Sequence, residues 1–163
     1  MNYNRAYKKG GNPVVYLEQL ITSFIASAAF GILFNAPRES LFKCGLSGML
    51  GWMVYFGLTY QGYGAVLGTL AAAFFIALVS QMFAKFYKMP IIIFSVAGII
   101  PLVPGGLAYD TMRNIVENDY TTAVALGVKA LMISGAIAVG LVFSEVINHV
   151  FRRQGAIPRK AGS

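Results

Sequence analysis

The hydrophobic residues of this chain gather in five long segments that are separated by short polar stretches. The segments cover residues 14–35, 41–59, 63–84, 91–103 and 121–149. Within each of them the apolar residues follow one another continuously instead of alternating with polar ones, which is typical of membrane helices and not of barrel strands. The pattern therefore predicts an all-α integral membrane protein, built as a bundle of about five transmembrane helices.

The fourth segment is too short to cross a bilayer by itself. At ~1.5 Å per residue, residues 91–103 cover about 20 Å of a hydrocarbon core that is ~30 Å thick. The sequence Pro-Leu-Val-Pro-Gly-Gly occupies residues 101–106, and an amphipathic stretch runs from there to Asn118. We therefore predict a fourth helix that is interrupted by a Pro/Gly break and followed by a short amphipathic helix. A re-entrant fourth segment is the alternative.

Small residues recur at one-turn spacing in three of the apolar segments. In lipid, helices associate through close packing, and small side chains let their backbones approach. The pattern therefore favours a packed bundle over a set of isolated anchors. The residues are Ser23, Ser27 and Gly31; Gly64, Gly68 and Ala72; and Ala136, Gly140 and Ser144.

Polar, basic sequence flanks the apolar part of the chain. We divide the chain into a basic N-terminal leader (1–13), a single transmembrane helical domain (14–149) and a basic polar C-terminal tail (150–163). The first apolar segment is too long for the hydrophobic region of a signal peptide, so we interpret it as an anchor.

The lysines and arginines are unequally divided between the two sides of such a bundle. With five spans, the side of the C-terminal tail also carries Arg38, Lys43, Lys85 and Lys88, whereas the side of the leader carries Arg113. The positive-inside rule then places the C-terminus in the cytoplasm and the N-terminus outside. A re-entrant fourth segment would instead place both termini in the cytoplasm.

Composition narrows the class further. Hydrophobic residues make up 57% of the chain and charged residues only 12%, against about 25% charged in soluble domains. With one cysteine (Cys44) and one histidine (His149), the chain offers no internal disulfide, no metal cluster and no Cys/His nucleophile. No motif for phosphoryl transfer, no nucleophile elbow and no zinc signature is present either, so we expect no enzyme activity and no cofactor. The formal charge of +7 lies at the ends and in the loops, which indicates attraction to the membrane surface rather than nucleic-acid binding.

The break carries the chemistry of a substrate site. If a half-helix starts near Gly106, its first N–H groups and the positive end of its dipole suit a substrate carboxylate. Asp110, one turn further on, could bind the ammonium group of an amino acid, and Tyr109 could offer its hydroxyl. Alternatively, the prolines and glycines form a tight interfacial turn and Asp110 only complements the dipole. The candidate substrate-binding residues at the break are Pro101, Pro104, Gly105, Gly106, Tyr109 and Asp110.

Polar residues elsewhere in the apolar segments supply further candidates. Asp110 and Glu145 are the candidates for proton coupling, although Glu145 could equally pair with His149 one turn later at a helix end. Asn35 is either a helix terminator or a pore-lining amide. The aromatic residues around Trp52 and Tyr55 are most simply a membrane belt.

Three stretches of the chain resemble the threonine/serine exporter family. They are Phe-Asn-Ala-Pro-Arg at 34–38, Gly-Trp-Met-Val-Tyr at 51–55, and the run from Ile99 to Tyr109 with Met112. The likeness is to the small, separately encoded subunit, which corresponds to the C-terminal half of the long single-chain exporters, and it covers roughly residues 15–148. One departure is Gly106, where other members often have serine.

The resemblance implies an inner-membrane carrier that exports small hydroxy amino acids or, in some members, a dicarboxylate. It also implies drive by the proton-motive force and a second, larger membrane subunit that carries the N-terminal half, and it adds some weight to the pore-lining alternative for Asn35. We therefore predict a subunit of a secondary transporter for threonine and serine. The alternatives are a succinate-type dicarboxylate exporter, a homo-oligomeric carrier, and a structural or assembly subunit without a solute path.

Overall fold

The computed structural model describes residues 13–154, and all its regular elements are helical. The predicted leader and tail therefore lie almost entirely outside the described residues. The helices, in chain order, are α2 (Pro13–Leu33), α3 (Arg38–Tyr60), α4 (Ala65–Tyr87), α5 (Ile91–Ile99), the 3-10 turn η1 (Ile100–Leu102), α6 (Gly105–Val116) and α7 (Tyr120–Gln154).

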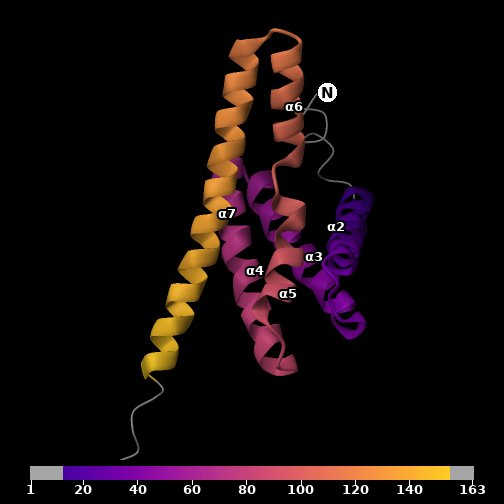
Figure 1. Cartoon of the computed structure of the whole chain (residues 1–163), viewed down its shortest axis with the longest axis vertical. Coiled ribbons are helices and arrows are strands. Elements are labelled where there is room, and N and C mark those ends of the chain that lie inside the picture. Colours follow the sequence, from indigo (N-terminus) through magenta and orange to yellow (C-terminus); the bar gives the residue numbers. More distant parts are fainter. Residues whose placement is uncertain (1–12, 155–163) are drawn as a thin grey trace, which may run out of the picture.

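The spans alternate in direction when α5, η1 and α6 are counted as one span, so the loops gather at two ends of the molecule (Figure 1). The α2–α3 and α4–α5 loops meet at one end, where the Nζ of Lys43 lies 3.3 Å from the ring centroid of Tyr87 and the Ser40 hydroxyl contacts the sulfur of Met89 at 2.8 Å. Arg113 lies in α6, toward the opposite end (Figure 1). The sequence predicted that four basic residues of the described part of the chain lie on the same side of the membrane. The structure places all four at one end of the bundle; they are Arg38, Lys43, Lys85 and Lys88.

The predicted interruption of the fourth span is confirmed. Four helices are long and apolar enough to cross a membrane, and a fifth span results if Ile91–Leu102 and Gly105–Val116 are taken together. The two halves meet at an angle of 49°, so the chain continues past the break instead of turning back toward the start of α5 (Figure 1). The protein is thus an all-helical, multi-pass membrane protein.

The predicted close approach of small residues is confirmed at two helix contacts. Between α2 and α3, a Cβ atom added to Gly48 would collide with the hydroxyl of Ser27. Between α7 and α4, a Cβ atom on Gly140 would lie 2.8 Å from the carbonyl oxygen of Leu70. Of the nine residues in the three sequence triplets, Gly64 is exposed, and the others are buried. Backbone contact at these points replaces the hydrophobic drive that is absent in lipid.

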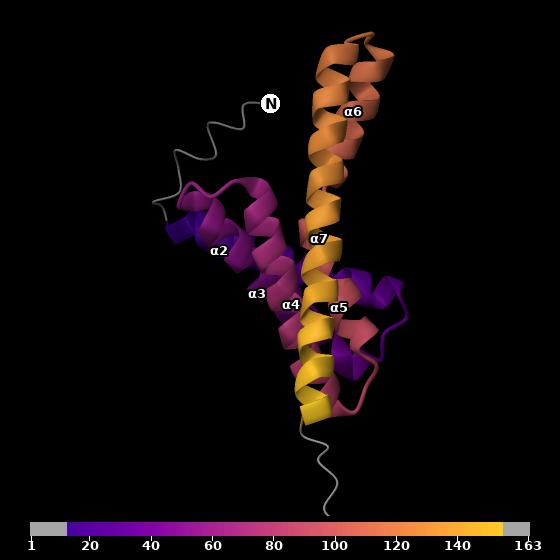
Figure 2. The ribbon, with the colours of Figure 1, turned by 90° about the vertical axis from the view of Figure 1, so that its left-hand side faces the viewer.

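Helix α6 and the first half of α7 form a hairpin that projects beyond the rest of the bundle (Figure 2). No residue of α6 is buried, and the helix packs mainly on α7, where Thr111 approaches Gly127. Helix α7 has 35 residues, which corresponds to about 52 Å and exceeds the ~30 Å hydrocarbon core. Its second half packs on α4.

The turn of this hairpin is fixed by an N-cap. The backbone N–H of Thr122 donates a 3.1 Å hydrogen bond to the Oδ1 of Asp119, the residue before α7. The pKa of Asp119 lies below its ordinary value because hydrogen bonds from the side chain and the backbone N–H of Thr122 favour the carboxylate. The N-cap therefore stabilises the start of α7 fully at a pH above the ordinary pKa of an aspartate. This stabilisation is lost as the pH falls through the lowered pKa of Asp119.

We expect Asp119→Ala to fray the first turn of α7, because the backbone N–H of Thr122 then loses its side-chain acceptor. Hydrogen exchange of the amides at residues 120–123 should become faster, while exchange in α4 stays unchanged. Asp119→Asn keeps an acceptor and serves as the control. Equal exchange in the alanine and asparagine variants would contradict the cap.

Candidate functional site

The break is a short turn between two helices that point in different directions. Pro101 lies in η1 and has no N–H, so the carbonyl of Ala97 lacks its usual α-helical donor. The N–H of Val103 donates to the carbonyl of Ile100 at 3.2 Å, and that of Gly105 donates to the carbonyl of Val103 at 2.8 Å. Helix α6 then begins at Gly105, one residue before the predicted start.

One side of the break is packed into the interior of the bundle. Leu102 is buried together with Ala72, Ala73 and Ile76 of α4, and η1 also contacts α2 and α3. Protein therefore covers the first half of the break, which is the condition that a broken helix must meet in lipid.

A pair of aromatic residues from α3 packs against this buried cluster. Trp52 and Tyr55 are half-buried, their ring centroids lie 5.0 Å apart, and both contact the cluster that contains Leu102. The Nε1–H of Trp52 donates a 2.7 Å hydrogen bond to the Oε1 of Gln19 in α2. Trp52 and Tyr55 thus belong to the interior beside the break and do not form the belt that the sequence suggested. An indole that reaches an amide partner in the interior is a group that can also recognise a polar ligand.

The amide of Gln19 was not among the candidates predicted from the sequence. The available signal was a polar residue within an apolar segment, which in a membrane helix is by default a functional candidate. Spacing along the chain could not pair this amide with Trp52, because the two residues lie in different helices.

The second half of the break is open. Nothing lies within 4 Å of a Cβ atom added to Gly105 or Gly106, and both residues are exposed. Tyr109 is 68% exposed, and Asp110 is exposed as well. The break therefore presents a wall of protein on one side and accessible backbone on the other.

The charged residues of α6 lie on its outer surface. Arg113 and Glu117 form an ion pair with 2.8 Å between Nε and Oε1, and both side chains are more than half exposed. Asp110 stands one turn before Arg113 on the same helix. An open surface with alternating charges is able to hold a zwitterion, provided that water or another protein surface covers it.

Two predicted site residues lie away from the break. Asn35 lies just after α2 with a left-handed φ of 55°, as a terminator does. It belongs to the α2–α3 loop, which meets the α4–α5 loop where the Ser40 hydroxyl contacts Met89, just before α5 begins. Helix α5 has nine residues, or about 13 Å, between that end and the break. Glu145 lies in the second half of α7, next to Ser144, which accepts a hydrogen bond from Gln81 of α4. The structure therefore brings Pro101, Pro104, Gly105, Gly106, Tyr109 and Asp110 into one region, but not Asn35 or Glu145.

Within residues 13–154, no group of three or more histidine, cysteine, aspartate and glutamate side chains is arranged to hold a metal ion. Cys44 is fully buried, and its sulfur lies 3.5 Å from the carbonyl oxygen of Ile93. It is a packing residue between α3 and α5.

The family model described as threonine/serine exporter, ThrE, matches residues 19–147. This range includes α3 to α6 entirely and most of α2 and α7. No solved structure matches the chain. Two of the three stretches that carry the family resemblance, the one around Trp52 and the one at the break, come together in the buried cluster, whereas the stretch around Asn35 lies apart.

Proposed function

Since the chain belongs to the threonine/serine exporter family, we propose that it is a subunit of a secondary transporter that exports threonine and serine across the inner membrane. The family match points to a transporter rather than an enzyme. The observation that carries the proposal is the broken helix, which has its first half inside the bundle and its second half accessible.

The break supplies groups that match an amino-acid zwitterion. At the start of α6 the N–H groups of Gly106 and Leu107 have no backbone partner and can bind a carboxylate, and the glycines let the substrate approach the backbone. Asp110 would bind the ammonium group, and Tyr109 would offer its hydroxyl. Alternating exposure of this site would then move the solute.

Coupling to protons needs an acidic group that meets the substrate. Asp110 lies within two turns of Gly105 on the same helix, whereas Glu145 lies far along α7. Asp110 is therefore the better candidate for the proton-carrying residue. Protonation of its carboxylate would release the ammonium group, which links solute movement to the proton-motive force.

A second, larger membrane subunit would complete the pathway. Helix α6 exposes apolar side chains together with charged ones; Met112 is 63% and Val116 78% exposed, and Glu117 stands beside them. A charged side chain in the centre of a bilayer costs about 2.5–3.5 kcal/mol or more unless protein or water surrounds it. A partner that resembles the N-terminal half of the exporter family would cover this surface; a second copy of the chain is the alternative occupant.

Efflux from preloaded cells tests the proposal. Labelled threonine and serine should leave cells that carry this chain with its partner, and an uncoupler should stop the efflux. Cells with neither subunit and cells with this chain alone are the controls. Efflux from cells that carry this chain alone would show that the carrier is a homo-oligomer and not a two-subunit complex. If both subunits reach the membrane and neither amino acid leaves, the threonine/serine proposal is wrong, and succinate is the next solute to measure.

A further inference from the structure

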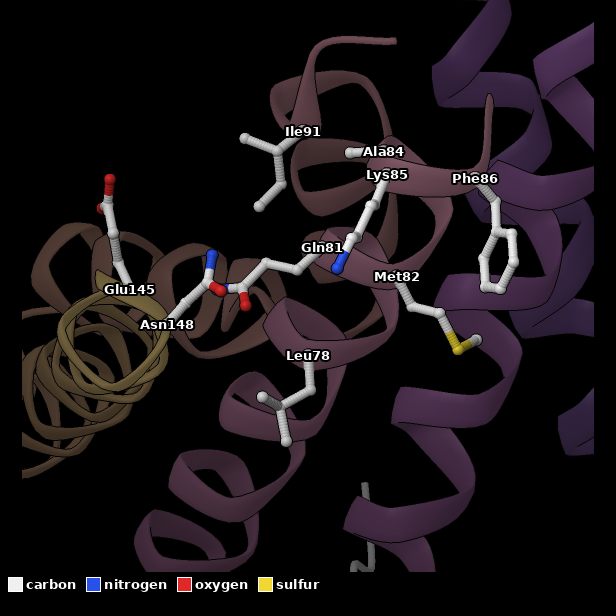
Figure 3. A pocket seen from close by; sticks show the side chains of 9 residues that line it. All are labelled: Leu78, Gln81, Met82, Ala84, Lys85, Phe86, Ile91, Glu145 and Asn148. Atoms are coloured by element: carbon white, nitrogen blue, oxygen red, sulfur yellow. The ribbon is translucent and has the colours of Figure 1, made fainter. Parts of the chain in front are cut away.

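A groove lies between α4, α5 and α7 (Figure 3), at the end of the bundle opposite the α6–α7 turn (Figure 1). Its volume is about 1060 Å³. Figure 3 shows Lys85 on the α4 wall and Glu145 and Asn148 on the α7 wall, with Gln81 between them. None of these side chains belongs to the break.

The two walls are fixed relative to each other at the base of the groove. The amide nitrogen of Gln81 donates to the hydroxyl of Ser144 at 3.1 Å and to its carbonyl oxygen at 3.3 Å. Ser144 is fully buried. Because a buried bridge joins α4 to α7 at this point, the charged groups above it are held on opposite sides of a defined space.

The groove offers one cation and one anion that do not pair with each other. Within the described residues the ion pair is Arg113–Glu117, and Lys85 and Glu145 form none. Asn148 adds an amide beside Glu145. The polar part therefore matches a ligand that carries a negative and a positive group at once.

The rest of the lining is apolar and faces outward. Leu78 is 38%, Met82 48% and Ile91 41% exposed. Leu78 and Met82 precede Lys85 on α4, whereas Ile91 begins α5 on the other side of Lys85 (Figure 3). A ligand that fills the groove must accordingly have a long apolar part, which threonine and serine lack.

We propose that this groove binds a zwitterionic phospholipid with a primary ammonium group, that is, a phosphatidylethanolamine. Lys85 binds the phosphate, Glu145 and Asn148 bind the ammonium group, and an acyl chain lies along Leu78 and Met82. The ammonium group of this lipid donates hydrogen bonds to the carboxylate, whereas the methylated headgroup of phosphatidylcholine has no N–H to donate. The site therefore distinguishes the two lipids through Glu145.

Native mass spectrometry of the full chain in detergent tests this assignment. The chain is offered equal amounts of phosphatidylethanolamine, phosphatidylcholine and phosphatidylglycerol with the same acyl chains. We expect the wild type to retain phosphatidylethanolamine over phosphatidylcholine by roughly fivefold, the effect of a partly exposed charge-assisted contact. Glu145→Gln should remove this preference without changing the retention of phosphatidylcholine, and Lys85→Gln should lower the retention of all three lipids.

Matched controls at the same end of the bundle are Lys88→Gln and Glu39→Gln, which remove the same charges from exposed residues that do not line the groove. Leu78→Trp fills the apolar part and should lower retention of every lipid without changing the headgroup order. Equal retention of phosphatidylethanolamine and phosphatidylcholine by the wild type overturns the proposal. An equal loss of the phosphatidylethanolamine preference in the Glu39 and Glu145 variants also overturns it. So does displacement of the lipid by free threonine, because the groove would then be a solute site.

Discussion

Gly106→Leu is expected to lower export strongly while the folded bundle stays intact. A Cβ atom at this position meets nothing within 4 Å, so the structure accommodates the side chain without rearrangement. If the substrate carboxylate binds the start of α6, however, the leucine occupies its place. Loss of the hydrogen bonds between the carboxylate and the backbone costs about 1.5–3 kcal/mol, so we expect efflux of threonine to fall roughly tenfold or more.

Gly135→Leu is the matched control, because Gly135 lies in α7 and likewise has open space around an added Cβ atom. Both variants should reach the membrane in equal amounts and show the same thermal unfolding. Loss of efflux in the Gly106 variant alone would support a site at the break. Unchanged efflux in it would remove the break from the substrate path, and loss of membrane-inserted protein would assign Gly106 to assembly.

Gly48→Ala is expected to prevent normal packing of α2 on α3. The added methyl group would collide with the hydroxyl of Ser27 and lie 2.6 Å from the Cβ of the same residue. Rotation of the buried Ser27 hydroxyl would leave the Cβ of that residue in place, so the two helices must move apart. Overpacking of this kind costs about 1–3 kcal/mol, and we expect a clear fall in the thermal unfolding temperature of the purified chain.

A second substitution on the opposite helix tests the cause of this loss. Ser27→Gly removes both colliding atoms, and the Ser27 hydroxyl has no hydrogen-bond partner within the described residues that would be lost with it. The double variant should therefore be more stable than Gly48→Ala alone, even though glycine inside a helix costs about 0.5–1 kcal/mol. If the double variant unfolds at a temperature as low as, or lower than, that of Gly48→Ala alone, the contact between Gly48 and Ser27 does not explain the loss of stability.

The local sequence pattern was sufficient to predict a helical membrane protein and most of its helices. Continuous apolar runs predicted the long spans, because lipid requires every backbone group to be satisfied within the helix. Pro101 and Gly105 marked the interruption and its position to within one residue, since proline and glycine act on the backbone of their own segment. The small-residue triplets identified the contact faces of α2 and α7, with Gly64 as the exception.

The neighbours of the break followed from tertiary structure alone. Trp52 was expected at the membrane surface, and Gln19 drew no attention; in the fold they hydrogen-bond each other beside the cluster that holds Leu102. Hydropathy describes how apolar a segment is, but not which side of its helix turns inward.

By itself, the sequence determined that this protein is a helical membrane protein of the exporter family with an interrupted fourth span. Only the tertiary structure decided which polar groups meet. It separated Asn35 and Glu145 from the break, joined Trp52 to it, and placed Lys85 across a groove from Glu145. The reason is that segment propensities depend on residues within a few turns, whereas a site is made where helices distant in the chain cross, and those crossings are set by the packing of whole faces.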